Sequence, residues 1–397
     1  MDVEAWGDAG THDRVGSSED DALLIQRNDP SLKNVAITLS RDPPQDGEII
    51  PDAKIREFGE GIGNNTHLRY LRIFGEGGRE SADEGTERFQ LLCTGINKNQ
   101  SIKKFSLFGV NFGGDEFRLL NPFLLNNNNL QSITLGNGLN REGMRWLLTA
   151  LMRRNNPLDK FNLSDNSTNG YLVEELLMTL IENPALTPKL VVLRLNTLSQ
   201  NGCRSIGRIL QDARCSMEEI NLAVTQIIND DAAFCFADAL VTNTTLRSMH
   251  LYQLGITTTG LGAICRSLFN TASINSTYSS NHTLQDFFSR GIFRSTALDE
   301  CLEWNRSMNK KQVARCKIFM QHFIRNFKME PFKEMKSDLL LRVVTFVEKA
   351  SAENGGVRNE DACNSIIFQL LKNDPSICDG KKFGTVENDN PCKRRRL

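Results

Sequence analysis

The sequence predicts an α/β solenoid, which is a linear stack of repeated strand–helix units. Three observations predict it: a short apolar pattern recurs at near-constant spacing, segments of helical periodicity lie between its copies, and asparagines separate several helices from the next strand. A chain of 397 residues is also longer than one ordinary hydrophobic core organises, whereas a repeat array grows in one dimension.

The recurring pattern has the form apolar-x-x-apolar-x-apolar. Its seven clear copies are 34, 28, 28, 32, 27 and 29 residues apart and begin at Leu68, Ile102, Leu130, Leu158, Leu190, Met217 and Leu246. Leu32 begins a further copy 36 residues before Leu68, and we expect a degenerate copy at Ile274. Alternation with period two predicts that each copy is a strand with its apolar side chains buried.

The segments between these strands have helical periodicity, as residues 142–154 and 202–210 illustrate. Several are followed by asparagine, at Asn97, Asn99, 126–129, Asn155, Asn156 and Asn243. Asparagine tolerates left-handed backbone and bonds the local chain, which suits a turn from helix to strand. Each unit is therefore strand, loop, helix and turn. Stacked units would bury one continuous core, with parallel strands on the inner curve and helices on the outer curve.

These residues resemble the ribonuclease-inhibitor-like class of the leucine-rich-repeat (LRR) family. The resemblance covers about residues 30–285 and rests on the strand pattern and on the helix pattern of Gly202, Ile206 and Leu210. It implies an LRR horseshoe. The Asn or Cys that the family places after each strand is found at Asn166, while other residues occupy that position at Val110, Gly138, Leu198 and Leu254.

The chain is expected to have four parts. Residues 1–29 form a disordered acidic leader, 30–285 the LRR solenoid, 286–378 an α-helical C-terminal cap and 379–397 a disordered basic tail. Three segments of the cap, 312–327, 336–350 and 361–371, have helical spacing and would cover the open edge of the last strand. Residues 281–323 also resemble an element that follows the repeats in LRR proteins expanded in unicellular eukaryotes.

Composition favours no charge-driven partner, and such a partner would need a local charged patch. The 47 basic and 48 acidic residues balance, so no net field attracts nucleic acid or an anionic membrane. No apolar run is long enough to span a bilayer, and the acidic start lacks the features of a secretory signal, so we expect a cytoplasmic or nuclear monomer. The run Lys393, Arg394, Arg395 and Arg396 is a candidate nuclear import signal, although chance explains so short a run equally well.

The strand positions that alternate with the buried ones should form an exposed face. Aromatic and basic residues there are types that dominate binding energy at protein interfaces. The candidate protein-binding residues are Tyr70, Arg72, Phe74, Lys104 and Phe108 in a first cluster, His250, Tyr252 and Tyr278 in a second, and Arg194 between them. The alternative is that they are ordinary cross-strand pairs, or that Phe74 and Phe108 turn into the core.

The sequence offers no sign of catalysis. It contains no phosphate-binding glycine loop with Lys-Ser/Thr, no His-Glu-x-x-His and no clustered Cys and His, so no catalytic residue, metal or cofactor is predicted. The ten cysteines are scattered and are expected to be reduced core residues. The leading hypothesis is a scaffold that binds an unidentified protein. The alternatives are an LRR regulator of a small GTPase, which would use Arg72 or Arg194, and an innate-immunity sensor module.

Overall fold

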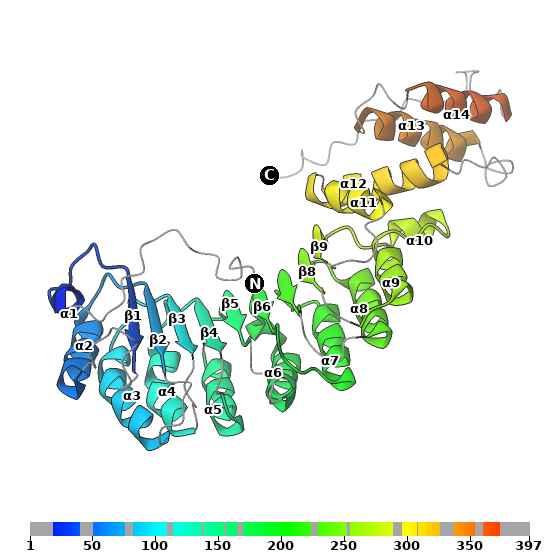
Figure 1. The fold of residues 1–397 in the computed structure, drawn as a ribbon. Coiled ribbons are helices and arrows are strands. Elements are labelled where there is room, and N and C mark those ends of the chain that lie inside the picture. Colours follow the sequence, from blue (N-terminus) through cyan, green and yellow to red (C-terminus); the bar gives the residue numbers. More distant parts are fainter. Residues whose placement is uncertain are drawn as a thin grey trace, which may run out of the picture. The chain divides into compact units, whose positions relative to one another are not determined.

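A computed structural model describes residues 19–39, 51–75, 82–108, 114–136, 139–154, 156–164, 170–223, 229–251, 255–288, 296–307, 309–325, 337–353 and 360–373. They belong to two compact units (Figure 1). The first, here called the solenoid unit, contains the described residues up to Leu268 and those of Thr283–Leu302. The second, here called the C-terminal unit, contains the described residues of Phe269–His282 and those from Glu303 onward.

The solenoid unit contains one open sheet of nine parallel strands in sequence order (Figure 1). The strands are β1 (Asn34–Thr38), β2 (Tyr70–Phe74), β3 (Lys104–Phe108), β4 (Ser132–Gly136), β5 (Lys160–Asn162), β6 (Leu190–Val192), β7 (Glu219–Asn221), β8 (Ser248–His250) and β9 (Asp286–Phe288). Every neighbouring pair is parallel and joined through a strand–helix unit. The predicted α/β LRR solenoid is therefore confirmed.

Helices alternate with these strands and lie along one side of the sheet within the solenoid unit (Figure 1). They are α1 (Glu19–Gln26), α2 (Asp52–Asn64), α3 (Ala82–Ile96), α4 (Gly114–Asn126), α5 (Arg141–Met152), α6 (Gly170–Glu182), the 3-10 turn η2 (Pro184–Leu186), α7 (Gln200–Gln211), α8 (Asp230–Thr242) and α9 (Thr258–Leu268). Helix α1 lies in the segment assigned to a disordered leader, and its Ile25 is buried in the core. The rest of that leader, residues 1–18, lies outside the described residues.

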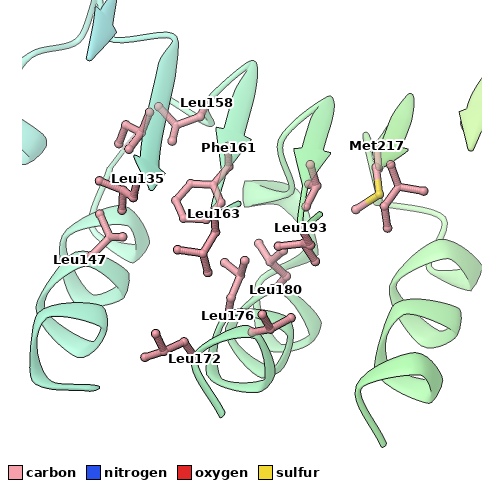
Figure 2. Packing of buried hydrophobic residues seen from close by; sticks show 14 of the residues in the cluster. Leu135, Leu147, Leu158, Phe161, Leu163, Leu172, Leu176, Leu180, Leu193 and Met217 are labelled. Atoms are coloured by element: carbon pink, nitrogen blue, oxygen red, sulfur yellow. The ribbon is translucent and has the colours of Figure 1, made fainter. Parts of the chain in front are cut away.

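The core forms where the apolar side of the strands faces the apolar stripe of the helices. In β2, Leu71 and Ile73 are fully buried, whereas the residues between and beside them are half-buried. Figure 2 shows the same arrangement further along the chain, where Phe161 and Leu163 of the fifth repeat point toward leucines of α6, such as Leu176. Burial of each such side chain stabilises the fold by about 1.5–3 kcal/mol, and no repeat achieves it alone.

The sixth strand is shifted by two residues from its predicted register. Phe161 pairs with Val191 and Val191 with Ile220, so the pattern begins at Pro188 and not at Leu190. The prediction was wrong because proline occupies the usual leucine position and the apolar run Leu190–Leu193 also fits the pattern two residues later. In the structural register, the residue after this strand at the family's Asn position is Asn196.

The prediction of a strand at Ile274 is wrong. Residues Ile274–Tyr278 form the short helix α10, because the hydroxyl of Ser273 accepts a hydrogen bond from the Ser276 amide (3.0 Å) and caps the helix N-terminus. The ninth strand is instead β9, in which Phe287 pairs with Met249 of β8.

Buried asparagines join successive repeats at the turns between helices and strands. Asn99 is 1% exposed, and its Nδ2 donates to the carbonyl oxygens of Ile62 (2.6 Å) and Asn65 (2.8 Å) in the preceding repeat. Its Oδ1 accepts from the amides of Ser101 and Ile102 at 2.8 and 2.9 Å. Equivalent buried amides belong to Asn65, Asn127 and Asn243. In the turn after α5, the guanidinium of Arg154 donates to the Leu124 and Leu130 carbonyls.

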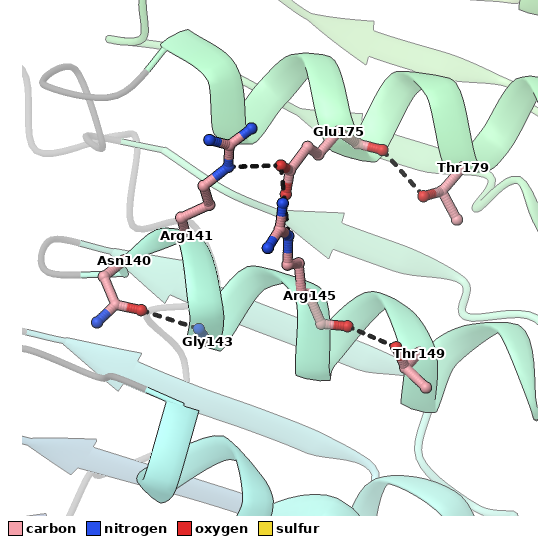
Figure 3. Close-up of polar contacts among 7 residues, drawn as sticks. All are labelled: Asn140, Arg141, Gly143, Arg145, Thr149, Glu175 and Thr179. Carbon is pink, nitrogen blue, oxygen red and sulfur yellow. Dashed lines mark hydrogen bonds and ion pairs between the residues drawn. The ribbon is translucent and has the colours of Figure 1, made fainter.

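Side-chain contacts also tie neighbouring helices together (Figure 3). Glu175 of α6 accepts a hydrogen bond from Arg141 Nε of α5 at 2.9 Å, and Arg145 Nε lies 3.8 Å from the same oxygen. Asn140 caps α5 by accepting from the Gly143 amide at 2.8 Å. The Arg141–Glu175 pair links α5 to α6, and as a largely exposed ion pair it contributes no more than about 1 kcal/mol.

The C-terminal unit contains α10, α12 (Lys310–Ile318), the π-helical turn η3 (Phe319–Arg325), α13 (Ser337–Glu353) and α14 (Glu360–Asn373), and α11 (Thr296–Ser307) ends in it. The three predicted helices of this region are thus confirmed. A core that includes Phe319, Phe323, Val347 and Leu370 holds it together. The predicted role as a cap stays a prediction.

Histidine and lysine side chains hold α10 inside the C-terminal unit. The ammonium of Lys317, which is fully buried, donates to the Asn281 carbonyl at 2.8 Å, and His322 Nε2 lies 2.8 Å from the Thr277 hydroxyl. His282 Nε2 lies 2.9 Å from the Tyr278 carbonyl. Burial, and then the positive charge of Lys317, lower the pKa of His282 to about 4.

The asparagine links predict a position-dependent stability loss. Asn99→Ala leaves two carbonyls and two amides of the turn without partners, so we expect the free energy of unfolding to fall by about 2–4 kcal/mol. Asn129→Ala is the matched control, because its amide donates to the Gln100 carbonyl from an exposed position and its loss should cost less than about 1 kcal/mol. Urea unfolding followed by circular dichroism measures both, and equal losses would contradict the proposed role of the buried amides.

The lowered pKa of His282 predicts that the C-terminal unit loses stability in mild acid. The folded unit keeps this histidine neutral while the unfolded chain takes up a proton below about pH 6.5, so stability falls as the pH drops from about 6.5 to about 4, by roughly 2 kcal/mol. Hydrogen exchange of residues 310–325 measures this change. His282→Gln should reduce the pH dependence, whereas Ser279→Ala should retain it; the same profile in both variants would refute the assignment.

Candidate functional site

The candidate site is the set of strand side chains that alternate with the buried ones, here called the strand face. Parallel register aligns them into rows that cross the sheet. One row begins Asn34, Tyr70, Lys104, Ser132 and Lys160, and the next begins Ala36, Arg72, Ser106, Thr134 and Asn162. The site is therefore built on regular backbone, which holds side chains more firmly than loops do.

Tyr70, Arg72 and Phe74, which belong to the first predicted cluster, contact one another in the structure. The Tyr70 hydroxyl accepts hydrogen bonds from Arg72 Nε (3.1 Å) and Nη2 (2.9 Å) and lies 3.2 Å from the Ser106 hydroxyl. The Arg72 guanidinium also lies 5.0 Å from the Tyr70 ring centroid and 5.8 Å from that of Phe74, which is within the range of cation–π attraction. Three half-buried side chains are thus held in one arrangement.

Phe74 and Phe108 extend this cluster across the sheet. Their rings stack with centroids 5.6 Å apart and planes inclined by 22°. Both are half-buried, so they do not turn into the core. Gly136 of β4 makes room for Phe108, since a Cβ there would lie 2.8 Å from the ring. Phe74 and Phe108 therefore form a cross-strand pair, as the alternative interpretation expected. Because both rings are only half-buried, part of each stays accessible to a partner.

A second cluster lies at the other end of the sheet. The His250 ring stacks on Phe288 with a centroid distance of 4.4 Å, and its Nε2 lies 3.4 Å from Glu219 Oε1 and 3.1 Å from the Ser248 hydroxyl. Phe288 is 40% exposed. The sequence prediction missed Phe288 because its strand has the shortened pattern Leu284-x-x-Phe287, without a third apolar residue.

The remaining predicted binding residues lie in different parts of the chain. Lys104 lies on the strand face and is exposed, while Arg194 is half-buried just after β6. Tyr278 does not belong to the strand face, because it lies in α10 of the C-terminal unit. Tyr252 and the basic run Lys393–Arg396 lie outside the described residues.

Asn196 shows how the chain turns after β6. It is 1% exposed, and its amide donates to the Leu163 and Leu193 carbonyls at 2.6 and 2.9 Å. The preceding Leu195 has a φ of 58°, a conformation that costs a non-glycine residue energy. The asparagine that the LRR pattern places after a strand is thus present in this repeat and links it to the one before.

Within the described ranges, no three His, Cys, Asp or Glu residues are placed to hold a metal ion. The eight described cysteines form no disulfide, and burial raises the pKa of Cys203 to about 12, which keeps its thiol protonated and unreactive. No described helix is long and apolar enough to cross a bilayer.

Comparison with known proteins finds a similar chain, whose name includes leucine-rich repeats. No family model matches the chain. A mouse (Mus musculus) protein, "NACHT, LRR and PYD domains-containing protein 14", is 26% identical over 233 residues. The match covers 51% of this chain and 23% of the mouse protein, so the chain spans less than a quarter of that relative. The similarity agrees with an LRR arrangement.

The space beside Gly136 predicts how the first cluster is disrupted. Gly136→Val brings side-chain atoms into contact with the Phe108 ring, so the ring must leave its stack on Phe74. We expect a stability loss of about 1–2 kcal/mol and altered NMR shifts of both rings. Thr134→Val, two residues earlier in the same strand, should leave the ring shifts almost unchanged. Unaltered ring shifts in Gly136→Val would contradict this arrangement.

Proposed function

We propose that this protein is a non-enzymatic scaffold that binds another protein on the strand face of its LRR solenoid. The observation that carries the proposal is the Tyr70 cluster, meaning Tyr70, Arg72, Phe74 and Phe108. Aromatic and arginine side chains contribute most binding energy at protein interfaces, and here they occupy the adjacent strands β2 and β3.

Preorganisation supports this function. Ordering a flexible side chain on binding costs about 0.5–1.5 kcal/mol. Arg72 is already held by the Tyr70 hydroxyl, and Phe74 by its stack on Phe108, so a partner would meet side chains whose positions are set before it binds. The His250 cluster offers a second such contact on the same sheet.

The subtype of the repeat belongs to the same proposal. In the structural register, the patterns from Ile102 to Leu246 are 28, 28, 30, 29 and 29 residues apart. Each is followed by an α-helix, as in the ribonuclease-inhibitor-like class. We extend the proposal to a monomer located in the cytoplasm or nucleus that needs no cofactor and binds neither nucleic acid nor membrane.

Regulation of a small GTPase is not favoured by any contact in the structure. That function would need Arg72 or Arg194 to reach a bound nucleotide. Arg72 instead donates to Tyr70 within its own strand, and Arg194 is half-buried at the end of β6. Unchanged hydrolysis across a panel of small GTPases after addition of the protein would remove this alternative.

The proposal predicts loss of partner capture in a triple variant. Tyr70→Ser, Arg72→Ser and Phe74→Ser together should abolish capture of the specific partner from cell lysate, because they remove the anchoring side chains, while the unfolding midpoint shifts by no more than a few degrees. Tyr171→Ser, Arg153→Ser and Phe234→Ser form the matched control, which removes the same residue types from exposed helix positions. A capture profile that is the same for both variants would refute binding at this cluster.

A further inference from the structure

The residues that immediately precede the paired part of each strand form a row of their own, here called the strand-start row. Backbone hydrogen bonds connect its neighbours, for example from the Lys103 amide to the Arg69 carbonyl at 2.8 Å. Across the nine strands its members are Lys33, Arg69, Lys103, Gln131, Asp159, Lys189, Glu218, Arg247 and Gln285. Adjacent backbones are about 4.8 Å apart, so neighbouring charges interact directly.

In the second half of this row, opposite charges alternate and compensate. Lys189 Nζ lies 3.0 Å from Asp159 Oδ1, and Arg247 Nε lies 3.7 Å from Glu218 Oε2. The hydrogen bond to Asp159, together with the charges of Asp159 and Glu218, raises the pKa of Lys189. The protein therefore supplies the counter-charges for this part of the row itself.

The first three positions differ, because Lys33, Arg69 and Lys103 are all basic and all exposed. In the described part of the chain no ion pair joins any of them to an acidic side chain, and Arg69 donates instead to the Ser101 carbonyl at 2.9 Å. The exposed Lys104 follows Lys103. Like charges on adjacent strands repel one another, so an anionic partner would be bound favourably here.

The basic part of the row is continuous with the Tyr70 cluster. Arg69 directly precedes Tyr70, and Lys104 pairs in register with Tyr70. A ligand that contacts Tyr70 and Phe74 would thus lie next to the side chains of Arg69 and Lys104. Beyond β4 the acidic residues of these rows are balanced by basic ones, such as Asp159 by Lys189 and Glu218 by Arg247, so a long polyanion would gain no further attraction there.

We propose that Lys33, Arg69 and Lys103 dock a short acidic segment of the protein partner, one in which Asp or Glu residues adjoin the aromatic or apolar residues that contact the Tyr70 cluster. The inference rests on the proposed function. A short acidic peptide is favoured over nucleic acid because the cationic stretch spans only β1 to β3 and the charges beyond it compensate one another.

Binding of a labelled peptide tests the inference. The probe is a fluorescein-labelled peptide in which Glu and Asp alternate with Phe and Leu, added to the full chain at low ionic strength and followed by fluorescence polarisation. The charge-reversed variant Lys33→Glu, Arg69→Glu and Lys103→Glu should weaken binding about tenfold, the loss expected when three exposed ion pairs become repulsive contacts. The neutral variant Lys33→Gln, Arg69→Gln and Lys103→Gln should weaken it less and guards against a folding defect.

The matched control is Arg56→Glu, Lys98→Glu and Arg153→Glu, which changes the net charge equally at exposed positions away from the strand starts and should leave peptide binding unchanged. Three results would each overturn the inference. They are an equal loss of peptide binding in both charge-reversed variants, no binding of the acidic peptide by the unaltered protein, and binding of a single-stranded oligonucleotide that is tighter than binding of the peptide. The proposed function stands even if this inference fails, provided that the triple serine variant at Tyr70, Arg72 and Phe74 no longer captures the partner. An unaltered capture profile removes the proposed function whatever the peptide shows.

Discussion

The parallel register of the nine strands is the constraint on which the rest of the structure depends. Because each strand pairs with the next without reversal, every second side chain falls into a row on one side of the sheet and the others fall into the core. Leu71, Phe105 and Ile133 thus form one buried row, while Tyr70, Lys104 and Ser132 form a row on the strand face. Core and candidate site are two consequences of the same alignment.

Polar contacts set the register where apolar packing alone would leave it ambiguous. The apolar run around β6 fits the strand pattern in two ways, and the buried amide of Asn196 joins this repeat to Leu163 of the one before in the register that the structure adopts. Asn99 forms a similar link between the first and second repeats. Since an unpaired buried amide is costly, such side chains exclude registers that hydrophobic burial tolerates.

Most of the fold, and the first part of the site, could be predicted from the sequence. Strands such as β2 to β4 follow a regular apolar pattern, so their boundaries and strand-face residues, including Tyr70 and Phe108, follow from alternation. The helix at Ile274 could not be predicted in this way, because a serine cap overrides an apolar spacing. Contacts such as the stack of His250 on Phe288 depend on strands 38 residues apart in the chain, which periodicity does not align.

The central claim is that a protein partner contacts the strand face at the Tyr70 cluster, and site-specific photo-crosslinking tests it most directly. A photoreactive amino acid at Lys104, which is exposed on the strand face beside Tyr70, should form a covalent adduct with the partner in cells. The same amino acid at Glu60, exposed on helix α2, should form none. Adducts of the same partner from position 60 and none from position 104 would contradict the claim.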